Sequence, residues 1–375
     1  MADIKKIAFV ANTSWSIYKF RLYLIQQLIA KSYQIIVLAP YDKYAEFFKD
    51  LPSITFIPIS HFESKNLSPL KDIQLFRELA GHYKALKPDL IFHYTIKANI
   101  FGSLAAARCG ISSVSVITGL GYAFLGNSFL KGAAKFLYKR SLKKNAEVWF
   151  LNKDDQLTFI EAGLVSASRT FLLPGEGIDT DLFTASPYTE KQVVTFLVIA
   201  RLIKHKGIYE YVEAARILKA KGLQARFQLL GFFEDKSPIA ITQNHVEQWA
   251  SQNLIDYLGQ TDDVVPFIEQ ADCIVLPSYR EGMPLSLLEG ASMCKALIAT
   301  DTPGCREIIS DGVNGYLCHK KDSANLAQKM EQYYDLPAAE KIRMGMSGRQ
   351  KVLRQFKKEI ITALYVQKTE QLLRQ

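Results

Sequence analysis

The feature that most restricts the fold of this chain is a repeated alternation of short apolar runs with segments of helical periodicity. The runs are rich in β-branched and aromatic residues, as strands buried in a sheet are. Strands that alternate with helices form crossover units on a parallel sheet, so the pattern predicts a doubly wound α/β fold. In the first half, strands are expected at residues 6–11, 34–39, 54–59, 90–93, 114–118 and 148–151, and helices at 18–30, 70–86 and 99–108.

A break in this alternation divides the chain. Residues 174–187, PGEGIDTDLFTASP, collect turn formers and lack periodicity. A chain of 375 residues is also longer than one hydrophobic core usually organises. We therefore expect two Rossmann-like domains that face a central cleft, at residues 1–180 and 188–355, with a C-terminal helix at 356–375 that packs back on the first. In the second domain, strands are expected at residues 193–200, 225–231, 255–259, 272–277, 295–300 and 315–318.

The composition restricts the class of protein further. Apolar residues make up 49% of the chain and the net charge is +9, which indicates a folded globular protein with anionic partners. The five cysteines form no CxxC pair, so we predict reduced thiols in the cytosol rather than a zinc site or a disulfide framework. The first apolar run is too short for a signal peptide, and no run reaches the ~18 residues of a membrane-spanning helix. Any membrane contact is expected at the protein surface.

The strongest sequence signal is PSYREGMPLSLLEGAS, residues 277–292, which follows the apolar run CIVL. It carries Glu281 and Glu289 with seven residues between them, and Pro284 suits the first turn of a helix. Glu281 is then expected in the loop before the helix and Glu289 within it. The turn between them offers backbone N–H groups and the positive end of the helix to a phosphate. This turn consists of Gly282, Met283, Pro284 and Leu285.

A second signal lies upstream in IARLIKHKG, residues 199–207. Arg201 lies just past an expected strand, Lys206 follows five residues later, and Gly207 opens a helix. Two fixed cations at this point can grip a diphosphate and neutralise the charge that builds as it leaves. Two solvated cations at a strand end are the alternative, and the presence of both motifs in order favours the diphosphate site.

In these motifs the sequence resembles the retaining glycosyltransferases of family 4, which have the GT-B fold. The resemblance implies that Glu281 contacts hydroxyls of the donor sugar and that Glu289 accepts hydrogen bonds from the ribose. It assigns the diphosphate to Arg201 and Lys206. Glu281, Arg201 and Lys206 form the catalytic set that it implies.

The resemblance also bears on the nucleobase and on metal ions. YLGQTDDVVPFI resembles the segment that lines the base pocket, with Gly259 to Val264 near the nucleobase. Asp179-Thr180-Asp181 has the DxD form that another glycosyltransferase fold uses to hold a metal, but here it lies in the linker, where the resemblance makes it a turn. The resemblance implies a UDP-sugar as the donor substrate, with no metal and no other cofactor.

The first domain departs from the family at two loops. In place of a glycine-rich loop after the first strand it has NTSWSIYKFR, in which Ser14, Trp15 and Ser16 stand where the family has glycines. Many members carry a histidine where this chain has VITGLGY, and here Thr118 and Gly119 take that place. Neither residue can act as a base, so contacts to the sugar are expected from backbone groups or from another loop.

Another polar cluster follows the expected strand at residues 90–93. His93, Thr95, Lys97 and Asn99 lie there, and we expect the cluster to face the cleft. For His93 a structural role in the core is an equal alternative. Both interpretations stay open from the sequence alone.

Three segments, SIYKFR, HYTIKANIFGSLAA and GLG, are most similar to bacterial members of the family that add N-acetylhexosamines or related sugars to undecaprenyl-diphosphate-linked oligosaccharides. N-acetylgalactosaminyltransferases belong to this group. The similarity spans essentially the whole chain. It implies a lipid-linked saccharide as the acceptor, a peripheral position at the inner face of the cell membrane, and a role in surface glycan, capsule or glycoprotein biosynthesis.

A basic segment independently suggests a membrane surface as a partner. SFLKGAAKFLYKRSLKKN, residues 128–145, contains no acidic residue and has apolar residues at near-helical spacing. A basic amphipathic helix of this kind can lie on an anionic bilayer. An ordinary surface helix that packs on the sheet is an equal alternative. The cations are Lys131, Lys135, Lys139, Arg140, Lys143 and Lys144.

Other functions fit the sequence less well. A non-catalytic nucleotide-binding or nucleic-acid-binding α/β protein would need basic residues interleaved with aromatics along a groove, and the cations gather instead in the phosphate motif and one helix, so no nucleic acid is expected as a partner. An NAD-dependent dehydrogenase would need GxGxxG after its first strand, which this chain lacks. The pyridoxal-phosphate lysine motif of a phosphorylase is also missing.

Overall fold

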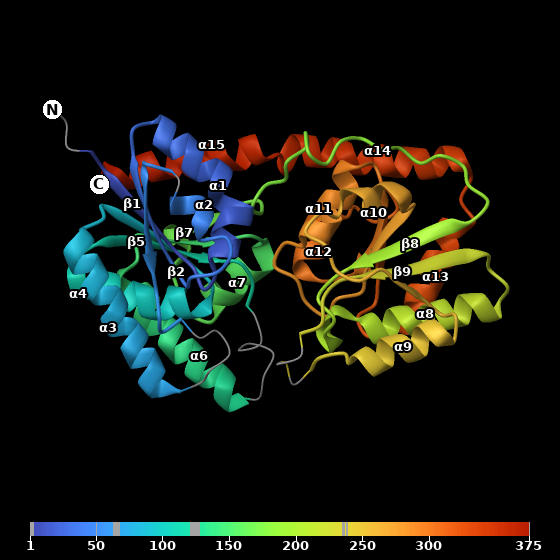
Figure 1. Ribbon diagram of the computed structural model, residues 1–375, viewed down its shortest axis with the longest axis horizontal. Helices are drawn as coiled ribbons and strands as arrows, with labels where there is room; N and C mark the ends of the chain where they lie inside the picture. Colours follow the sequence, from blue (N-terminus) through green and yellow to red (C-terminus); the bar gives the residue numbers. More distant parts are fainter. Residues whose placement is uncertain are drawn as a thin grey trace. The chain divides into compact units, whose positions relative to one another are not determined.

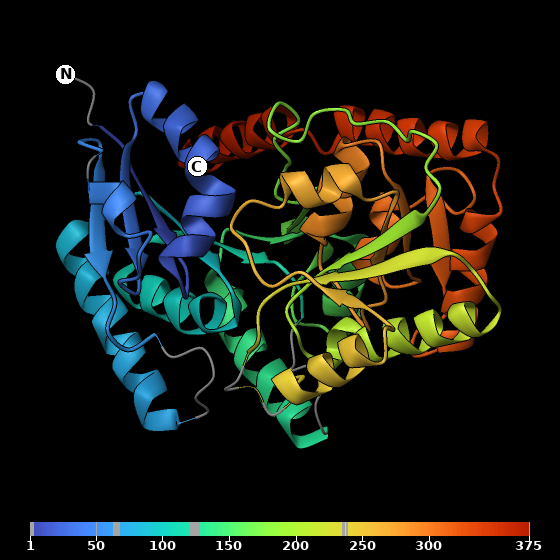
Figure 2. The ribbon, with the colours of Figure 1, turned by 45° about the vertical axis from the view of Figure 1, so that its right-hand side comes forward.

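The computed structural model describes residues 4–49, 51–62, 68–120, 128–234, 237 and 239–374, apart from the side chains of residues 128–131. The chain divides into two compact units (Figures 1 and 2). The first unit comprises Met1–Gly177 together with Lys358–Gln375, and the second comprises Ile178–Lys357. Each unit is built on its own parallel sheet, in agreement with the predicted doubly wound α/β class.

The sheet of the first unit has seven parallel strands in the order β3-β2-β1-β4-β5-β6-β7. Strand β4 is buried along its whole length, and β1, β2, β5 and β6 are buried except at their first residue, because helices cover both faces of the sheet. This burial explains why these strands read as continuous apolar runs. The short edge strand β7 was not predicted, since three half-exposed residues give little signal. The strands are β1 Lys6–Val10, β2 Gln34–Ala39, β3 Ile54–Pro58, β4 Leu90–Tyr94, β5 Ser112–Ile117, β6 Glu147–Phe150 and β7 Thr170–Leu172.

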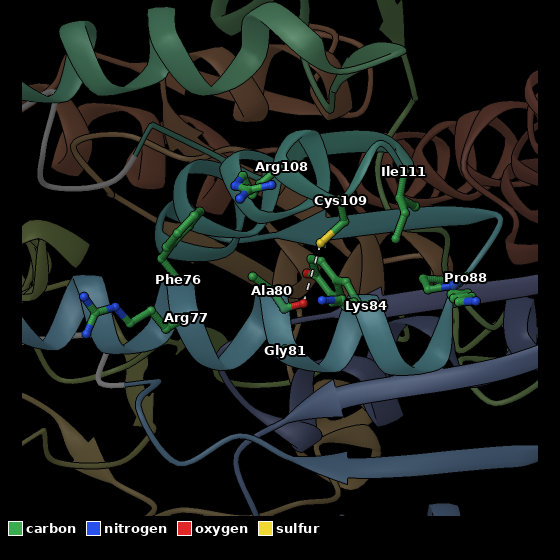
Figure 3. A pocket seen from close by; sticks show the side chains of 11 residues that line it. Phe76, Arg77, Ala80, Gly81, Lys84, Pro88, Arg108, Cys109 and Ile111 are labelled. Carbon is green, nitrogen blue, oxygen red and sulfur yellow. Dashed lines mark hydrogen bonds between the residues drawn. The ribbon is translucent and has the colours of Figure 1, made fainter.

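Helices α3 and α4 pack against each other on one face of this sheet, and a pocket lies between them (Figure 3). The C-terminal helix α15 lies beside α1 and packs Tyr365 on Phe92 and Trp149 of the sheet. The helices are α1 Ser14–Ala30, α2 Glu46–Lys49, α3 Pro69–Leu86, α4 Ser103–Cys109, α6 Ser128–Ser141, α7 Lys153–Glu161 and α15 Lys358–Leu373, with the shorter turns η1 Ala98–Gly102, η2 Leu142–Lys144 and η3 Ala167–Arg169.

The second unit has six parallel strands in the order β10-β9-β8-β11-β12-β13. One core joins the sheet to α8 and α13, and another joins its opposite face to α11 and α14. The strands are β8 Val194–Ile199, β9 Ala225–Leu230, β10 Asp256–Tyr257, β11 Cys273–Leu276, β12 Ala296–Thr300 and β13 Gly315–Cys318. The helices are α8 Ile208–Ala220, α9 Gln243–Ser251, α10 Val265–Gln270, α11 Leu285–Ser292, α12 Pro303–Ile308, α13 Ser323–Tyr334 and α14 Ala338–Gln355, with the turn η4 Lys204–Lys206.

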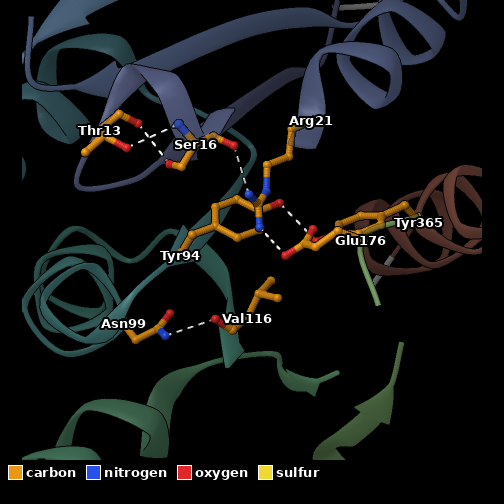
Figure 4. A network of polar contacts seen from close by, with 8 residues as sticks. All are labelled: Thr13, Ser16, Arg21, Tyr94, Asn99, Val116, Glu176 and Tyr365. Atoms are coloured by element: carbon orange, nitrogen blue, oxygen red, sulfur yellow. Dashed lines mark hydrogen bonds and ion pairs between the residues drawn. The ribbon is translucent and has the colours of Figure 1, made fainter. Parts of the chain in front are cut away.

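A buried ion pair lies inside the first unit. The guanidinium of Arg21, on α1, pairs with the carboxylate of Glu176, and the two side chains are only 3% and 10% exposed. Arg21 also lies 4.0 Å from the ring centroid of Tyr94, whose hydroxyl is 3.1 Å from that of Tyr365 (Figure 4). Burial lowers the pKa of Arg21, but the Glu176 carboxylate and the hydroxyls of Tyr94 and Tyr365 together outweigh this effect, and the pKa is raised. The network joins α1, β4 and α15 to Glu176, which lies next to the end of the segment Met1–Gly177.

The buried pair predicts a non-additive effect on stability. Arg21→Met should lower the free energy of unfolding by about 3–5 kcal/mol, because it leaves the Glu176 carboxylate buried without its counter-charge. Adding Glu176→Gln should recover most of that loss. Urea unfolding of the single and double variants measures both effects.

An exposed ion pair provides the control for this experiment. Arg216 and Glu213 are 48% and 51% exposed, so Arg216→Met should cost less than about 1 kcal/mol. Equal losses for Arg21→Met and Arg216→Met would show that the buried pair contributes no more than a surface pair.

Candidate active site

The topology of the second unit marks one place on its sheet for a ligand. The strand order reverses direction between β8 and β11, so this is the switch point of the sheet. Ligands of open parallel sheets bind outside the carboxyl ends of the strands at such a point. The loops that follow β8 and β11 carry the two sequence motifs and therefore meet at this edge.

Two ion pairs hold the cations of the first motif. Lys206 Nζ lies 2.5 Å from Glu281 Oε1, and both side chains are largely buried. Arg201 Nη1 lies 2.9 Å from Glu234 Oε2. The structure thus brings Lys206 and Glu281 together, although they are 75 positions apart in the sequence. Glu234 was not among the predicted residues, because nothing in its local sequence marks it as the partner of Arg201.

A glycine allows these two loops to approach each other. Gly207 has φ +72°, and a Cβ added there would lie 2.0 Å from the backbone oxygen of Pro277. Any side chain at this position would therefore be strained by its backbone conformation and would collide with the β11 loop. Gly207 also ends the turn η4, which holds Lys206, and caps the start of α8.

The loop between β11 and α11 is fixed by neighbouring segments. The N–H of Tyr279 donates to the carbonyl of His205 at 2.9 Å, and its hydroxyl donates to Glu210 at 2.6 Å. The pKa of His205 is lowered by burial and by Lys321 and Lys204, so its ring favours the neutral form. These contacts join the two motif loops at a second point.

The predicted phosphate turn lies at the start of α11. The helix begins at Leu285, so Pro284 is the capping residue rather than the first helical one, a difference of one position. A Cβ on Gly304 would lie 2.4 Å from the backbone oxygen of Gly282, so α12 packs directly beneath the turn. Glu289 lies within α11 as predicted and is buried. Its role toward a ribose stays a prediction.

The segment expected near a nucleobase forms a turn after β10. Gly259 has φ +77° and its carbonyl accepts the N–H of Gly231 at 2.8 Å. Val264 caps the short helix α10. The intervening residues 260–263 are exposed, and the hydroxyl of Thr261 accepts the N–H of Asp263 at 3.0 Å. Contact with a base stays a prediction for these residues.

The switch point of the first unit lies between β1 and β4, and the loop after β1 carries the residues that replace the glycines. Ser14 is buried and its hydroxyl donates to the carbonyl of Pro40 at 2.6 Å. The hydroxyl of Thr13 accepts the N–H of Ser16, which caps α1 (Figure 4). The side chain of Trp15 is exposed, and its backbone N–H donates to the carboxylate of Asp42 at 3.1 Å. Ser14 is therefore a structural residue, while Trp15 is open to solvent.

The interpretation of His93 as a residue that faces the cleft is wrong. His93 is fully buried on β4, with Nε2 3.0 Å from the hydroxyl of Tyr83 and Nδ1 3.4 Å from that of Ser103. Burial lowers its pKa to about 3. Side chains alternate along a strand, and position 93 points toward α3 while Phe92 points toward α15. The structural alternative holds for this histidine.

The neighbouring polar residues are arranged differently. Thr95 has φ +71°, a strained conformation for a β-branched residue, and its hydroxyl finds no hydrogen-bond partner among the described residues. The ammonium of Lys97 lies 2.7 Å from Asp72, so this cation is engaged within the unit. Thr118 and Gly119 are half-buried directly after β5. Thr95, at the carboxyl end of β4, is the member of this set best placed at the switch point.

The basic segment forms helix α6, and its apolar side packs inward. Tyr138 and Leu142 belong to a core cluster of the first unit, so the surface-helix alternative describes their role. The outer side carries the exposed side chains of Lys135, Lys139 and Arg140, together with Phe136, which is 63% exposed. The side chain of Lys131 lies outside the described residues. Lys143 and Lys144 are exposed in the turn η2 that follows.

The linker aspartates form a turn. The Oδ1 atom of Asp179 accepts the N–H groups of Asp181 and Leu182, each at 3.1 Å. In the described part of the chain, no three His, Cys, Asp or Glu side chains are grouped as the ligands of a metal ion would be. Within the same residues, no helix has the length and apolarity needed to cross a bilayer.

The Arg21 network was not among the features predicted from the sequence. Arg21 and Glu176 are separated by 155 positions, and Tyr94 and Tyr365 by 271. Each lies in an unremarkable local context. Arg21 itself was the available signal, because it lies on the inner side of the predicted helix at residues 18–30. A buried charge is rarely without a partner, so its position indicated an ionic partner elsewhere in the chain.

Comparisons with known proteins agree with the two halves of the chain. Residues 6–152 match the family described as Glycosyl transferase 4-like, and residues 183–351 match the family described as Glycosyl transferases group 1. Both units therefore match glycosyltransferase families. The alternative of a non-catalytic nucleotide-binding or nucleic-acid-binding protein finds no support.

Individual proteins are similar along most of the chain. The N,N'-diacetylbacillosaminyl-diphospho-undecaprenol alpha-1,3-N-acetylgalactosaminyltransferase of Campylobacter jejuni is 29% identical over 91% of this chain and 92% of that protein. The UDP-Gal:alpha-D-GlcNAc-diphosphoundecaprenol alpha-1,3-galactosyltransferase of Escherichia coli is 24% identical over 69% of each chain. The crystal structure of Anabaena Alr3699/HepE in complex with UDP-glucose covers 98% of this chain and 99% of that one, with a TM-score of 0.77 and 17% identity.

The structural likeness shows the fold, and the family matches show the enzyme class. Two Rossmann-like units with these matches, and relatives along nine tenths of the sequence, confirm the GT-B prediction. The chain belongs to the GT-B glycosyltransferases, with a 4-like domain in its first unit and a group 1 domain in its second.

Proposed function

We propose that this enzyme moves a hexose or N-acetylhexosamine from a UDP-sugar to a polyprenyl-diphosphate-linked saccharide, with retention of anomeric configuration. The Lys206–Glu281 pair at the switch point of the second unit carries the proposal. A cation suited to a diphosphate and a carboxylate suited to sugar hydroxyls lie there on adjoining loops. Two relatives are named for undecaprenyl-diphosphate-linked substrates, which supports the acceptor class.

The donor would bind by exchange of ionic partners. Arg201 and Lys206 are each held by a carboxylate, so neither cation has to be ordered when the diphosphate arrives. The diphosphate would take the place of Glu234 and Glu281 as counter-charge. Glu281 would then be released to accept hydrogen bonds from the sugar. The cations would neutralise the diphosphate in place of a metal ion.

The chemical step would break the bond between the anomeric carbon and the diphosphate oxygen. Positive charge develops on the sugar and negative charge on the leaving diphosphate, and Arg201 and Lys206 would stabilise the latter. The acceptor hydroxyl would attack from the side of the leaving group and give its proton to the departing phosphate oxygen. UDP and the extended saccharide would be the products, with the configuration retained.

Removal of either cation should slow catalysis without unfolding the protein. Arg201→Ala and Lys206→Ala should each lose about 2–4 kcal/mol of transition-state stabilisation, because each removes a charge that faces the leaving group. The measurement is kcat/KM for the UDP-sugar at subsaturating donor.

Lys204→Ala is the matched control for these variants. Lys204 is exposed in the same turn η4, two positions from Lys206. Its removal should change kcat/KM by less than about threefold. Near-normal turnover in Arg201→Ala and Lys206→Ala, or an equal loss in Lys204→Ala, would contradict the assignment.

The stereochemistry of the product tests the mechanism. A panel of UDP-sugars incubated with undecaprenyl-diphosphate-linked saccharides should yield one extended product with the anomeric configuration of the donor. Nuclear magnetic resonance of the new linkage reads the configuration. An inverted linkage would refute the proposed mechanism, and no transfer from any UDP-sugar would refute the donor class.

The exposed side of α6 supports our proposal that the enzyme lies at the inner face of the cell membrane. Lys135, Phe136, Lys139 and Arg140 share that side, because they recur at the spacing of a helical turn. Each cation near an anionic bilayer contributes about 1 kcal/mol. Phe136 supplies an aromatic side chain that can enter the headgroup region. Lys143 extends the charge beyond the end of the helix.

Charge reversal on this surface should release the enzyme from anionic membranes. The variant with Lys135, Lys139 and Lys143 changed to glutamate should lose binding to phosphatidylglycerol vesicles in a flotation assay, because attraction becomes repulsion. Transfer to a full-length polyprenyl acceptor should slow, while transfer to a short soluble acceptor stays nearly unchanged.

A control variant with Arg226, Lys320 and Arg354 changed to glutamate reverses the same number of charges on the second unit. Persistent binding, or equal losses with both acceptors, would show that α6 is a packing element only.

A further inference from the structure

A pocket of about 710 Å³ lies on the first unit between the C-terminal halves of α3 and α4 (Figure 3). This volume falls in the range of pockets that hold small organic ligands. The pocket is separate from the candidate active site, because its walls precede β4 and β5. It therefore lies at the amino edge of the sheet, whereas the motif loops follow the carboxyl ends of strands.

The floor of the pocket is apolar and has unfilled space. Phe76, Ala80 and Ile111 line it, and the thiol of Cys109 lies 3.5 Å from the carbonyl of Ala80. Gly81 faces this space from α3, and a Cβ added there would meet no atom within 4 Å. A ligand with an apolar part can occupy this floor without displacing protein atoms.

The rim of the pocket is basic. Arg77, Lys84, Lys87 and Arg108 line it, and no acidic residue in the described part of the chain does. Within the described residues, none of these four side chains has a hydrogen-bond or ion-pair partner. The nearest acids in the sequence, Glu78 and Asp89, are already engaged. Glu78 accepts the N–H groups of Ser60 and His61, and Asp89 lies 2.8 Å from the ammonium of Lys5.

Helix ends account for only part of this charge. The carboxyl ends of α3 and α4 each carry about half a negative charge, which would favour Lys84, Lys87 and Arg108. Together the two ends offset about one of the four positive charges. Arg77 lies more than two turns before the end of α3 and has no such reason to be basic. A strong positive potential therefore remains over an apolar floor.

The same edge of the sheet carries further cations. Because the strands are parallel, the segments before β4, β5 and β6 share one edge. Lys143 and Lys144 precede β6 in the turn η2, which contacts α4. Both side chains are exposed, so the basic edge continues past the pocket.

We infer that this pocket binds an amphiphile in which a phosphate group adjoins an apolar substituent. The phosphate is held by Lys84, Lys87 and Arg108, and the apolar part enters the floor beside Gly81 and Cys109. A phospholipid headgroup region and a free phosphorylated apolar metabolite share this chemistry. The site is additional to the donor and acceptor sites proposed above, and its test needs no glycosyl transfer.

The thiol of Cys109 provides the readout. Cys109 is half-buried in the pocket, whereas the other four cysteines are buried, so a maleimide should modify Cys109 first in the folded protein. Dihexanoyl phosphatidic acid, used below its micelle concentration, should slow this modification at least about tenfold at saturation. Inorganic phosphate lacks the apolar part and dihexanoyl phosphatidylcholine lacks the net charge, so each should protect much less.

Pyrene butyl phosphate, which carries an apolar group but is not a lipid, separates the two sources of ligand. Protection by phosphatidic acid alone assigns the site to lipids, and protection by both compounds assigns it to phosphorylated apolar molecules in general.

Paired variants test the residues. The variant with Lys84 and Arg108 changed to glutamate should weaken protection by at least about tenfold, because two contacts become repulsive. A control with Arg226 and Arg354 changed to glutamate reverses the same charge on the second unit and should protect normally. Gly81→Leu fills the floor while it favours the helix, so the protein should fold and lose protection, whereas Gly81→Ala should retain it.

Four results would overturn the inference. Equal protection by inorganic phosphate would leave no role for the apolar floor. Equal protection by phosphatidylcholine would leave none for the basic rim. Undiminished protection in Gly81→Leu would place the ligand elsewhere. Absence of protection by phosphatidic acid in the unaltered enzyme would show that the pocket does not bind this class of ligand.

Discussion

Parallel pairing of the strands is the constraint on which the remaining architecture depends. A parallel strand cannot be reached by a tight turn, so each strand must be followed by a crossover that covers one face of the sheet. The carboxyl ends of all strands then lie at one edge of each unit, and the loops that follow β8 and β11 are brought together there. Buried strands and converging loops are thus two consequences of the same pairing. The sheet also leaves an opposite edge, where no motif loop lies.

The charged groups at the second unit's edge are paired in advance of any ligand. Lys206 lies in a largely buried place, where its charge would be costly to hold without counter-charge, and Glu281 supplies that counter-charge. Arg201 is more exposed, and Glu234 is its ionic partner. A diphosphate bound there, as we propose, would exchange one anionic partner for another instead of ordering two flexible side chains. Gly207 is needed for this arrangement, since a side chain there would separate the two loops. Paired charges and the close approach of the two loops would therefore both support the proposed binding of a diphosphate.

The first unit uses buried polar groups for a different purpose. Arg21 and Glu176 join helix α1 to the end of the unit's main segment, and Tyr365 brings α15 to the same cluster. The C-terminal helix is thereby tied into a unit whose other residues precede it by nearly two hundred positions. His93 is likewise a buried polar group with partners inside the core, since both of its ring nitrogens are engaged by core hydroxyls. Cations that the core does not engage gather instead on α6 and along the amino edge of the sheet.

The sequence by itself determined the succession of strands and helices along the chain, apart from short elements such as β7, and the identity of the two motif loops. These features are local, because each can be read from a short stretch of the chain. They are the apolar periodicity, the turn residues, the spacing of Arg201 and Lys206, and the spacing of Glu281 and Glu289. Only the tertiary structure decided that Glu234 faces Arg201, that Glu176 faces Arg21, and that His93 points into the core. It also decided that the apolar side of α6 packs on the sheet and leaves Phe136 outside. The physical reason is that such partners are chosen by strand order and by the face of each element, and these depend on residues far apart in the chain.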